Sequence, residues 1–122
     1  MSDTPFAIVR LKKRAEFLAC AQASALARGA VLIQARPRAD GEPLVRVGFT
    51  ATKRIGGAVQ RNRAKRRLRE AARLLLPDFG RPGFDYVFIA RGGAIARPWA
   101  RLLDDMKSAL IRLAADRAAP HV

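Results

Sequence analysis

The sequence predicts an α+β sandwich, a single domain in which helices pack on one small sheet. Runs at 30–35, 44–52 and 84–90 have the composition or the alternation of strands. Three longer segments repeat apolar residues at helical spacing, and glycine pairs and prolines separate the runs. The chain has 122 residues, half of them apolar, which is enough for one modest core.

The first helix is predicted over about 12–26, after a lead-in of residues 1–10 that we expect to be extended or loosely ordered. Phe17 projects about 100° from Leu18. It is therefore either a residue at the rim of the core or a platform on which a base could stack. The segment 23–28 is ambiguous and could form a short extra strand. The apolar stripe consists of Leu11, Ala15, Leu18 and Ala25, with Ala21 and Leu26 at its margins.

Two strands follow at 30–35 and 44–52 and are expected to pair in antiparallel fashion. The segment between them, 36–43, contains Asp40-Gly41 and two prolines and is predicted to be a turn. Alternation in the second strand places Val45, Val47 and Phe49 on one face and Arg46, Gly48 and Thr50 on the other.

The second helix follows Gly56-Gly57 and is predicted from Ala58 to Leu76, where Pro77 ends it. Its apolar residues lie within about 60° of arc, a narrow stripe that must dock on the sheet. Small side chains in that stripe allow close approach, and the rest of the circumference is polar. The stripe consists of Ala64, Leu68, Ala71 and Leu75, flanked by Ala72.

The last strand, 84–90, is mostly apolar, as is typical of a strand interior. After Gly92-Gly93, Arg97-Pro98 opens a third helix, because proline suits the first turn. Its core stripe is predicted to consist of Trp99, Leu102, Leu103, Met106, Leu110 and Leu113. Its other face mixes both signs of charge: Asp104, Asp105, Lys107, Arg112 and Asp116.

The positive charge of the chain is large and unevenly distributed. The formal net charge is +14, and the 21 residues from Lys53 to Arg73 hold nine cations and one acid, Glu70. Charge this concentrated repels itself unless a polyanion lies beside it, which favours a nucleic-acid partner. An ordinary solvated helix would mix the signs. A membrane-surface helix would gather aromatic residues opposite its cations, which this one does not.

The start of the second helix adds a candidate anion site. Backbone N–H groups at Gly56-Gly57 could approach a phosphate, and the helix dipole favours one there. Lys53 and Arg54 stand just before the pair. A glycine pair alone is equally consistent with a simple turn, so the signal comes from its position before Arg61-Asn62-Arg63.

The chain lacks the residues of a self-sufficient enzyme. Its single histidine, His121, is next to last, and its two adjacent acids, Asp104 and Asp105, diverge by about 100° on a helix. A lone cysteine, Cys20, allows no intramolecular disulfide, fits a reducing cytosol and is expected to be an inert small hydrophobe. No apolar run reaches the roughly 18 residues of a membrane span. We therefore expect no phosphodiester cleavage by the protein alone.

Five motifs follow one another along nearly the whole chain. They are Arg10-Leu11-Lys12-Lys13 with Phe17; Val45-Arg46-Val47-Gly48-Phe49; Lys53-Arg54-Ile55-Gly56; Ala58-Val59-Gln60-Arg61-Asn62-Arg63-Ala64-Lys65-Arg66; and Asp85-Tyr86-Val87-Phe88-Ile89-Ala90-Arg91. This ordered set resembles the protein subunit of bacterial ribonuclease P, whose signature is Arg-Asn-Arg. Composition alone would leave a general RNA- or DNA-binding protein, such as a ribosomal or architectural factor, as the alternative.

The resemblance implies the order α-β-β-β-α-β-α, with a left-handed β-α-β crossover that carries the basic helix, against the usual right-handed rule. It implies one RNA-binding domain over residues 1–122, with about 1–9 and 118–122 loosely ordered. It also implies a cytoplasmic ribonucleoprotein endonuclease, with one protein per RNA and no membrane. In that enzyme the catalytic RNA, with Mg²⁺, removes the 5′ leader of precursor tRNA, while the protein binds both RNAs and contributes no catalytic residue.

Roles for single residues come from the same resemblance. Those facing the catalytic RNA would be Arg61, Asn62, Arg63, Lys65, Arg66 and Arg69. Those lining a cleft for the leader would be Phe17, Arg46, Lys53 and Arg91, which favours the stacking role for Phe17. Additional basic contacts would be Lys12, Lys13, Arg54 and Arg67. No metal ligand is fixed in the protein, and Asn62 is the candidate position beside a metal. The chain departs from the family pattern at Ala21, where a second aromatic is common, and at Gly92, where some members carry lysine.

Overall fold

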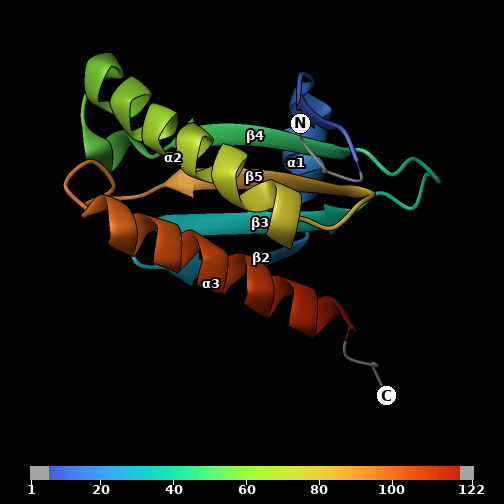
Figure 1. Ribbon diagram of the computed structural model, residues 1–122. Coiled ribbons are helices and arrows are strands. Elements are labelled where there is room, and N and C mark those ends of the chain that lie inside the picture. The colour runs from blue at the N-terminus through green and yellow to red at the C-terminus, as the bar shows by residue number, and fades with distance from the viewer. Residues whose placement is uncertain (1–5, 119–122) are drawn as a thin grey trace.

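The computed structural model describes residues 6–118, the last three by their backbone alone (Figure 1). The elements are β1 (Ile8–Arg10), α1 (Arg14–Ala21), β2 (Ser24–Arg28), β3 (Val31–Pro37), β4 (Val45–Ala51), the 3-10 turn η1 (Lys53–Ile55), α2 (Ala58–Phe79), β5 (Phe84–Ala90) and α3 (Trp99–Ala118). The predicted order is confirmed, with β1 added in front of it. Of the ends where we expect loose order, about 1–9 and 118–122, residues 1–5 and 119–122 lie outside the described residues, as does His121. Ile8 and Val9, by contrast, belong to β1, and residue 118 is the last of α3.

Within residues 6–118, five strands form one sheet in the order β1-β4-β5-β3-β2. The pairs β1–β4 and β4–β5 are parallel, whereas β5–β3 and β3–β2 are antiparallel. The two predicted strands β3 and β4 are therefore not neighbours, because β5 lies between them and pairs with both. Our expectation of a direct antiparallel pair is wrong, since a turn between two strands does not prevent a later strand from entering between them.

The connection from β4 through α2 to β5 is a left-handed crossover. Both strands run toward the left in Figure 1, α2 lies in front of them, and the chain passes from the upper strand to the lower one. Turned so that the strands point upward, this path moves to the left, against the common right-handed form. The crossover implied by the resemblance is therefore present.

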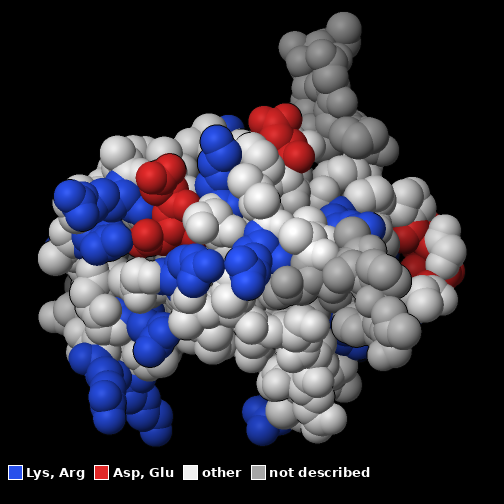
Figure 2. Space-filling view, turned by 90° about the horizontal axis from the view of Figure 1, so that it is seen from below, with Lys and Arg blue, Asp and Glu red and all other residues white. Residues whose placement is uncertain are grey.

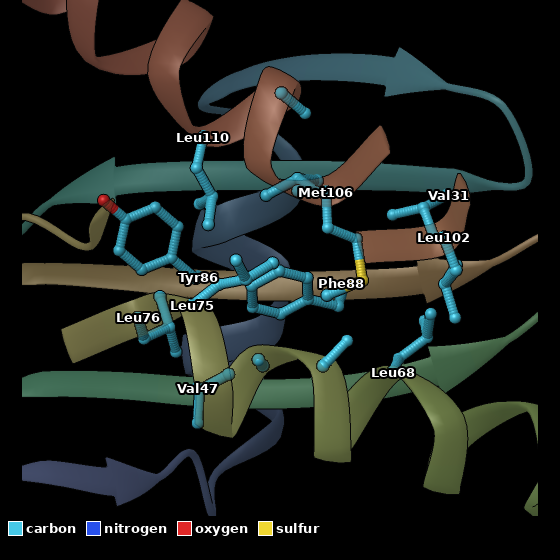
Figure 3. Close-up of a cluster of buried hydrophobic side chains, with 14 of the residues drawn as sticks. Val31, Val47, Leu68, Leu75, Leu76, Tyr86, Phe88, Leu102, Met106 and Leu110 are labelled. Carbon is cyan, nitrogen blue, oxygen red and sulfur yellow. The ribbon is translucent and has the colours of Figure 1, made fainter. Parts of the chain in front are cut away.

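The sheet is covered on both faces, which gives three layers. Helices α2 and α3 lie side by side on one face, and α1 lies on the other (Figure 1). Between the sheet and the two long helices is the main core, in which Phe88 of β5 lies among Leu68 of α2 and Met106 of α3 (Figure 3). A smaller cluster beneath α1 contains Leu11, Cys20 and Val87. Among the described residues, no helix is long and apolar enough to cross a membrane.

The first helix is shorter than predicted. It ends at Ala21, and the chain then forms β2, which pairs with β3 so that Leu26 lies opposite Ile33. The ambiguous segment is therefore a strand, because pairing at the sheet edge satisfies its backbone groups and packs Leu26 against the main core. The predicted stripe is also rotated: Leu18 is 53% exposed, whereas Cys20 has no exposed surface.

Two further differences concern the long helices. Helix α2 continues through Pro77 to Phe79, because the N–H of Gly80 donates to the carbonyl of Leu76 at 2.8 Å and Phe79 packs against the core. Proline thus costs one internal hydrogen bond without ending the helix. In α3 the stripe residues Leu102, Met106, Leu110 and Leu113 are buried and Leu103 is partly buried, but Trp99 at the start of the stripe is 37% exposed.

Candidate nucleic-acid interface

Helix α2 presents most of its cations because only a narrow stripe of it docks on the sheet. Ala64, Leu68 and Ala71 have no exposed surface, and the small alanines bring the helix close to the strands. Of the residues expected to face the catalytic RNA, Arg61 and Lys65 are half-buried; the exposed ones are Asn62, Arg63, Arg66 and Arg69. The predicted docking stripe is confirmed, and the long cationic surface follows from it.

Opposing carboxylates on α2 are few. Glu70 accepts hydrogen bonds from Arg73 at 2.5 and 3.2 Å, and these bonds lower the pKa of Glu70. Among residues 6–115, whose side chains are described, no carboxylate pairs with Arg63, Arg66 or Arg69. By contrast, red and blue side chains are interspersed on the face of the molecule seen from below (Figure 2). The surface suited to a polyanion is therefore that of α2.

The start of α2 is arranged as the glycine pair predicts. Gly56 has a φ of +139°, a conformation that favours glycine, and Gly57 is the N-cap residue. No side chain caps the first turn, which also contains no acidic residue. Lys53 and Arg54 lie in η1, immediately before it, and both are exposed. Uncapped N–H groups beside two cations form an environment that suits a phosphate.

Arg67 is tied to the protein itself. Its Nη1 donates to the carbonyl oxygens of Ala94 at 2.5 Å and Ile95 at 2.8 Å, and its guanidinium lies 5.7 Å from the centre of the Trp99 ring. These contacts hold the loop between β5 and α3 against α2. The fold therefore fixes the orientation of the Arg67 guanidinium.

Phe17 lies at the rim of the core, the first of the two alternatives that the sequence leaves open. It is partly buried against the cluster beneath α1, and its ring lies so close to Gly48 that a Cβ there would come within 2.4 Å of Cε1. Glycine at position 48 therefore lets the ring lie on the sheet. The remaining exposed part of the ring stays available at the surface.

Arg46 lies on the same face, within a network of charges. Its Nε and Nη2 each donate to the carboxylate of Asp85 at 2.7 Å, and its Nη1 donates to Glu16. The hydrogen bond to Asp85 raises the pKa of Arg46. The backbone N–H of Lys13, with that of Lys12, donates to Glu16 and lowers its pKa. Two carboxylates therefore already balance the charge of this predicted leader contact.

Lys53 and Arg91 lie at one end of the sheet. The last paired residues of the parallel strands β4 and β5 are Ala51 and Ala90. Both cations therefore follow the carboxyl ends of these two strands, at the same end of the sheet. Both are exposed. The structure thus brings together Phe17 with Arg46 and, further along the strands, Lys53 with Arg91.

The other predicted positions lie around these groups. Lys12 and Lys13 are exposed at the start of α1, and Ala21 is exposed at its end. Gly92 has open space around it, so its lack of a side chain is not required by packing.

Sequence reasoning missed Asp85, which has no exposed surface and also receives hydrogen bonds from Arg36 and Arg38. The sequence does contain a signal for this. Asp85 is the single acid in the otherwise apolar strand β5, and three arginines lie on or just after the neighbouring strands β3 and β4: Arg36, Arg38 and Arg46. A buried carboxylate requires such partners.

Two observations concern the capacity of the protein for catalysis or metal binding: the state of the Cys20 thiol and the distribution of metal-ligating side chains. Burial raises the pKa of the Cys20 thiol to about 11, which agrees with an inert residue. Between residues 6 and 118, no three or more His, Cys, Asp or Glu side chains gather as metal ligands would. Asn62 is an exposed residue of α2.

Comparison with known proteins decides the family. The family model for Ribonuclease P matches residues 7–114. The chain belongs to the ribonuclease P protein family. The ribonuclease P protein component of Caulobacter vibrioides is 67% identical over 118 residues, which cover 95% of this chain and 79% of that protein. That of Ruegeria pomeroyi is 55% identical, covering 88% and 87%.

Solved structures of ribonuclease P proteins share the fold. The protein from Staphylococcus aureus matches with a TM-score of 0.70 at 24% identity, covering 86% of this chain and 94% of that one. The protein from Thermotoga maritima matches with a TM-score of 0.68 at 25% identity, covering 84% and 96%. The sandwich and its crossover are thus features of the ribonuclease P protein fold.

Proposed function

We propose that this chain is the protein subunit of a bacterial ribonuclease P, which removes the 5′ leader from precursor tRNA to give mature 5′ ends. In this role α2 binds the catalytic RNA, and the face that carries α1 binds the leader. The observation that carries the proposal is the long cationic surface of α2. This surface faces away from the sheet because Ala64, Leu68 and Ala71, on the other side of the helix, are buried against it.

The division of labour follows from the side chains. Arg61, Asn62, Arg63, Lys65, Arg66 and Arg69 grip the catalytic RNA in this proposal. Arginine suits this task because it binds phosphate through two parallel hydrogen bonds. Phe17 offers a stacking surface for the leader, while Lys53 and Arg91 attract its backbone. Lys12, Lys13 and Arg54 add positive charge, and Arg46 helps to position α1.

Mg²⁺, bound mainly by the RNA, would supply the Lewis acid and the activated water of the hydrolysis. The protein contributes charge neutralisation and placement. We further propose that one protein binds each RNA and that the complex works in the cytoplasm.

The deciding experiment compares cleavage of precursor tRNA by the purified catalytic RNA at low Mg²⁺, with and without this protein. We expect faster cleavage when the protein is present, because its cations replace part of the Mg²⁺ requirement. The absence of stimulation would overturn the proposal, and so would cleavage by the protein alone.

A further inference from the structure

A surface hollow lies between α2 and the start of α3, and it includes Trp99, a residue to which the proposed function gives no role. It has a volume of about 410 Å³ and is lined by Arg66, Arg67, Arg69, Glu70 and Trp99. Its volume is within the range of small-molecule binding sites. Trp99 is the only tryptophan of the chain.

Trp99 is more exposed than its position predicts. It lies three residues before Leu102 on the buried stripe of α3, yet 37% of it is exposed. Residues three apart share one face of a helix, so an indole at this position would ordinarily be covered. Its exposed part lines the hollow.

Arg67 lies over this indole in a fixed position. Two backbone carbonyls hold its guanidinium, 5.7 Å from the centre of the ring. An aromatic ring and a planar cation fixed together are a surface on which a nucleobase stacks well. Little conformational entropy would be lost on binding, because Arg67 is already immobilised.

The charge around the hollow favours an anion. The carboxylate of Glu70 is occupied by Arg73. Among the residues whose side chains are described, none supplies a carboxylate to Arg66 or Arg69. A flat stacking surface beside Arg66 and Arg69 matches a nucleobase with its phosphate. An acidic peptide would pair with the two arginines but make no stacking contact with the indole.

We propose that this hollow binds an unpaired nucleotide of the catalytic RNA, with the base against Trp99 and Arg67 and a phosphate between Arg66 and Arg69. This inference rests on the proposed function, because Arg66 and Arg69 belong to the surface assigned to that RNA. The leader is the less suitable occupant, since α1, the helix that contains Phe17, lies on the opposite face of the sheet (Figure 1).

The single tryptophan makes a direct test possible with the unaltered protein. Its emission is recorded while catalytic RNA is added to saturation, and separately while single-stranded oligoadenylate or duplex RNA of equal length is added. Stacking predicts quenching by the catalytic RNA and by the single strand but not by bound duplex. Polyglutamate, a polyanion without bases, is the control. Unchanged emission at saturation with the catalytic RNA would overturn the inference, and so would quenching by polyglutamate in the absence of RNA.

Variants measure the size of the effect. Trp99→Ala should weaken binding of the catalytic RNA about 5- to 150-fold, the loss expected for one stacked base, whereas Trp99→Phe should recover most of the affinity. Leu74→Ala, at an exposed apolar position elsewhere on α2, is the matched control and should bind normally. Equal affinity of Trp99→Ala and wild type would contradict the proposal.

The two proposals fail in different ways. If the protein stimulates cleavage of precursor tRNA but Trp99 emission does not respond to the catalytic RNA, the nucleotide site is wrong and the proposed function stands. If the protein does not stimulate cleavage at all, the proposed function itself is wrong.

Discussion

Asp85 illustrates how one side chain organises the face that carries α1. It has no exposed surface and joins arginines of β3, β4 and the loop after β3. Arg46 continues the chain of contacts to Glu16, which accepts from the N–H groups of Lys12 and Lys13 at the start of α1. Phe17 follows Glu16 directly, so the buried carboxylate helps to fix the position of that ring.

Removing this carboxylate should destabilise the fold strongly. We expect Asp85→Ala to lower the free energy of unfolding by about 3–5 kcal/mol, because it leaves buried guanidinium groups without their partner. Urea denaturation measures the change. The control is Asp78→Ala, which removes an exposed acid from α2 and should stay within about 0.5 kcal/mol of wild type. An unchanged urea midpoint for Asp85→Ala would show that the network adds nothing to stability.

Cys20 should be unreactive in the folded protein. At pH 8, raising the thiol pKa from 9.0 to about 11 lowers the thiolate fraction roughly 100-fold. A thiol reagent should therefore modify Cys20 at least that much more slowly in native protein than in urea. Because folding raises the pKa of the Cys20 thiol, the contribution of this thiol to the free energy of unfolding is complete below pH 9 and is lost as the pH rises toward 11. Equal rates in buffer and urea would contradict this.

At the scale of elements, the long segments were predictable and the short ones were not. Helix α2 has about five turns of consistent pattern, so its docking stripe follows directly from the sequence. Helix α1 occupies only Arg14–Ala21 of the segment 12–26, about two turns, which is too few to fix the phase of a helix, and strand pairing decided the second half of the segment. The end of α2 differs from the prediction because a hydrogen bond of Gly80 and the packing of Phe79 outweigh Pro77.

The cationic face of α2 should act as one electrostatic unit. Replacing both Arg61 and Arg63 by alanine should weaken binding of the catalytic RNA. It should also reduce the slope of log affinity against log salt by about 0.7–0.9 for each phosphate that the variant no longer neutralises. Binding titrations at several salt concentrations measure this slope. Arg101→Ala, an exposed cation on α3, is the control and should leave it unchanged. An unaltered slope in the double variant would argue against binding of phosphate by these two residues.

At the scale of the whole molecule, the topology separates two surfaces. Helix α2 crosses in front of β4 and β5 while α1 lies behind them (Figure 1). The cationic helix and α1, which contains Phe17, are therefore on opposite faces of the sheet. The left-handed path could not be derived from the sequence by physical rules, since the common rule predicts the other hand. Nor could the hollow at Trp99, which depends on how α3 meets α2.

This separation predicts that the two binding steps can be altered independently. Arg63→Ala should raise the protein concentration that gives half-maximal stimulation of cleavage, because it weakens assembly. Phe17→Ala should leave that concentration unchanged and weaken binding of leader-bearing substrate by about 1–3 kcal/mol at saturating protein, because one base loses its stacking partner. Leaderless tRNA should bind the Phe17→Ala holoenzyme and the wild-type holoenzyme equally. Leu18→Ala, on the exposed side of α1, is the control variant and should behave as wild type.

The double variant completes the test. Distant sites without shared partners contribute additively, so Phe17→Ala combined with Arg63→Ala should show both losses, each within about 0.5 kcal/mol of its single variant. Titration of protein against cleavage rate gives the first quantity, and titration of substrate at saturating protein gives the second. A larger coupling would mean that the leader and the catalytic RNA share one surface. If Phe17→Ala weakened leaderless tRNA equally, Phe17 would act only as a core residue, and the leader would bind elsewhere.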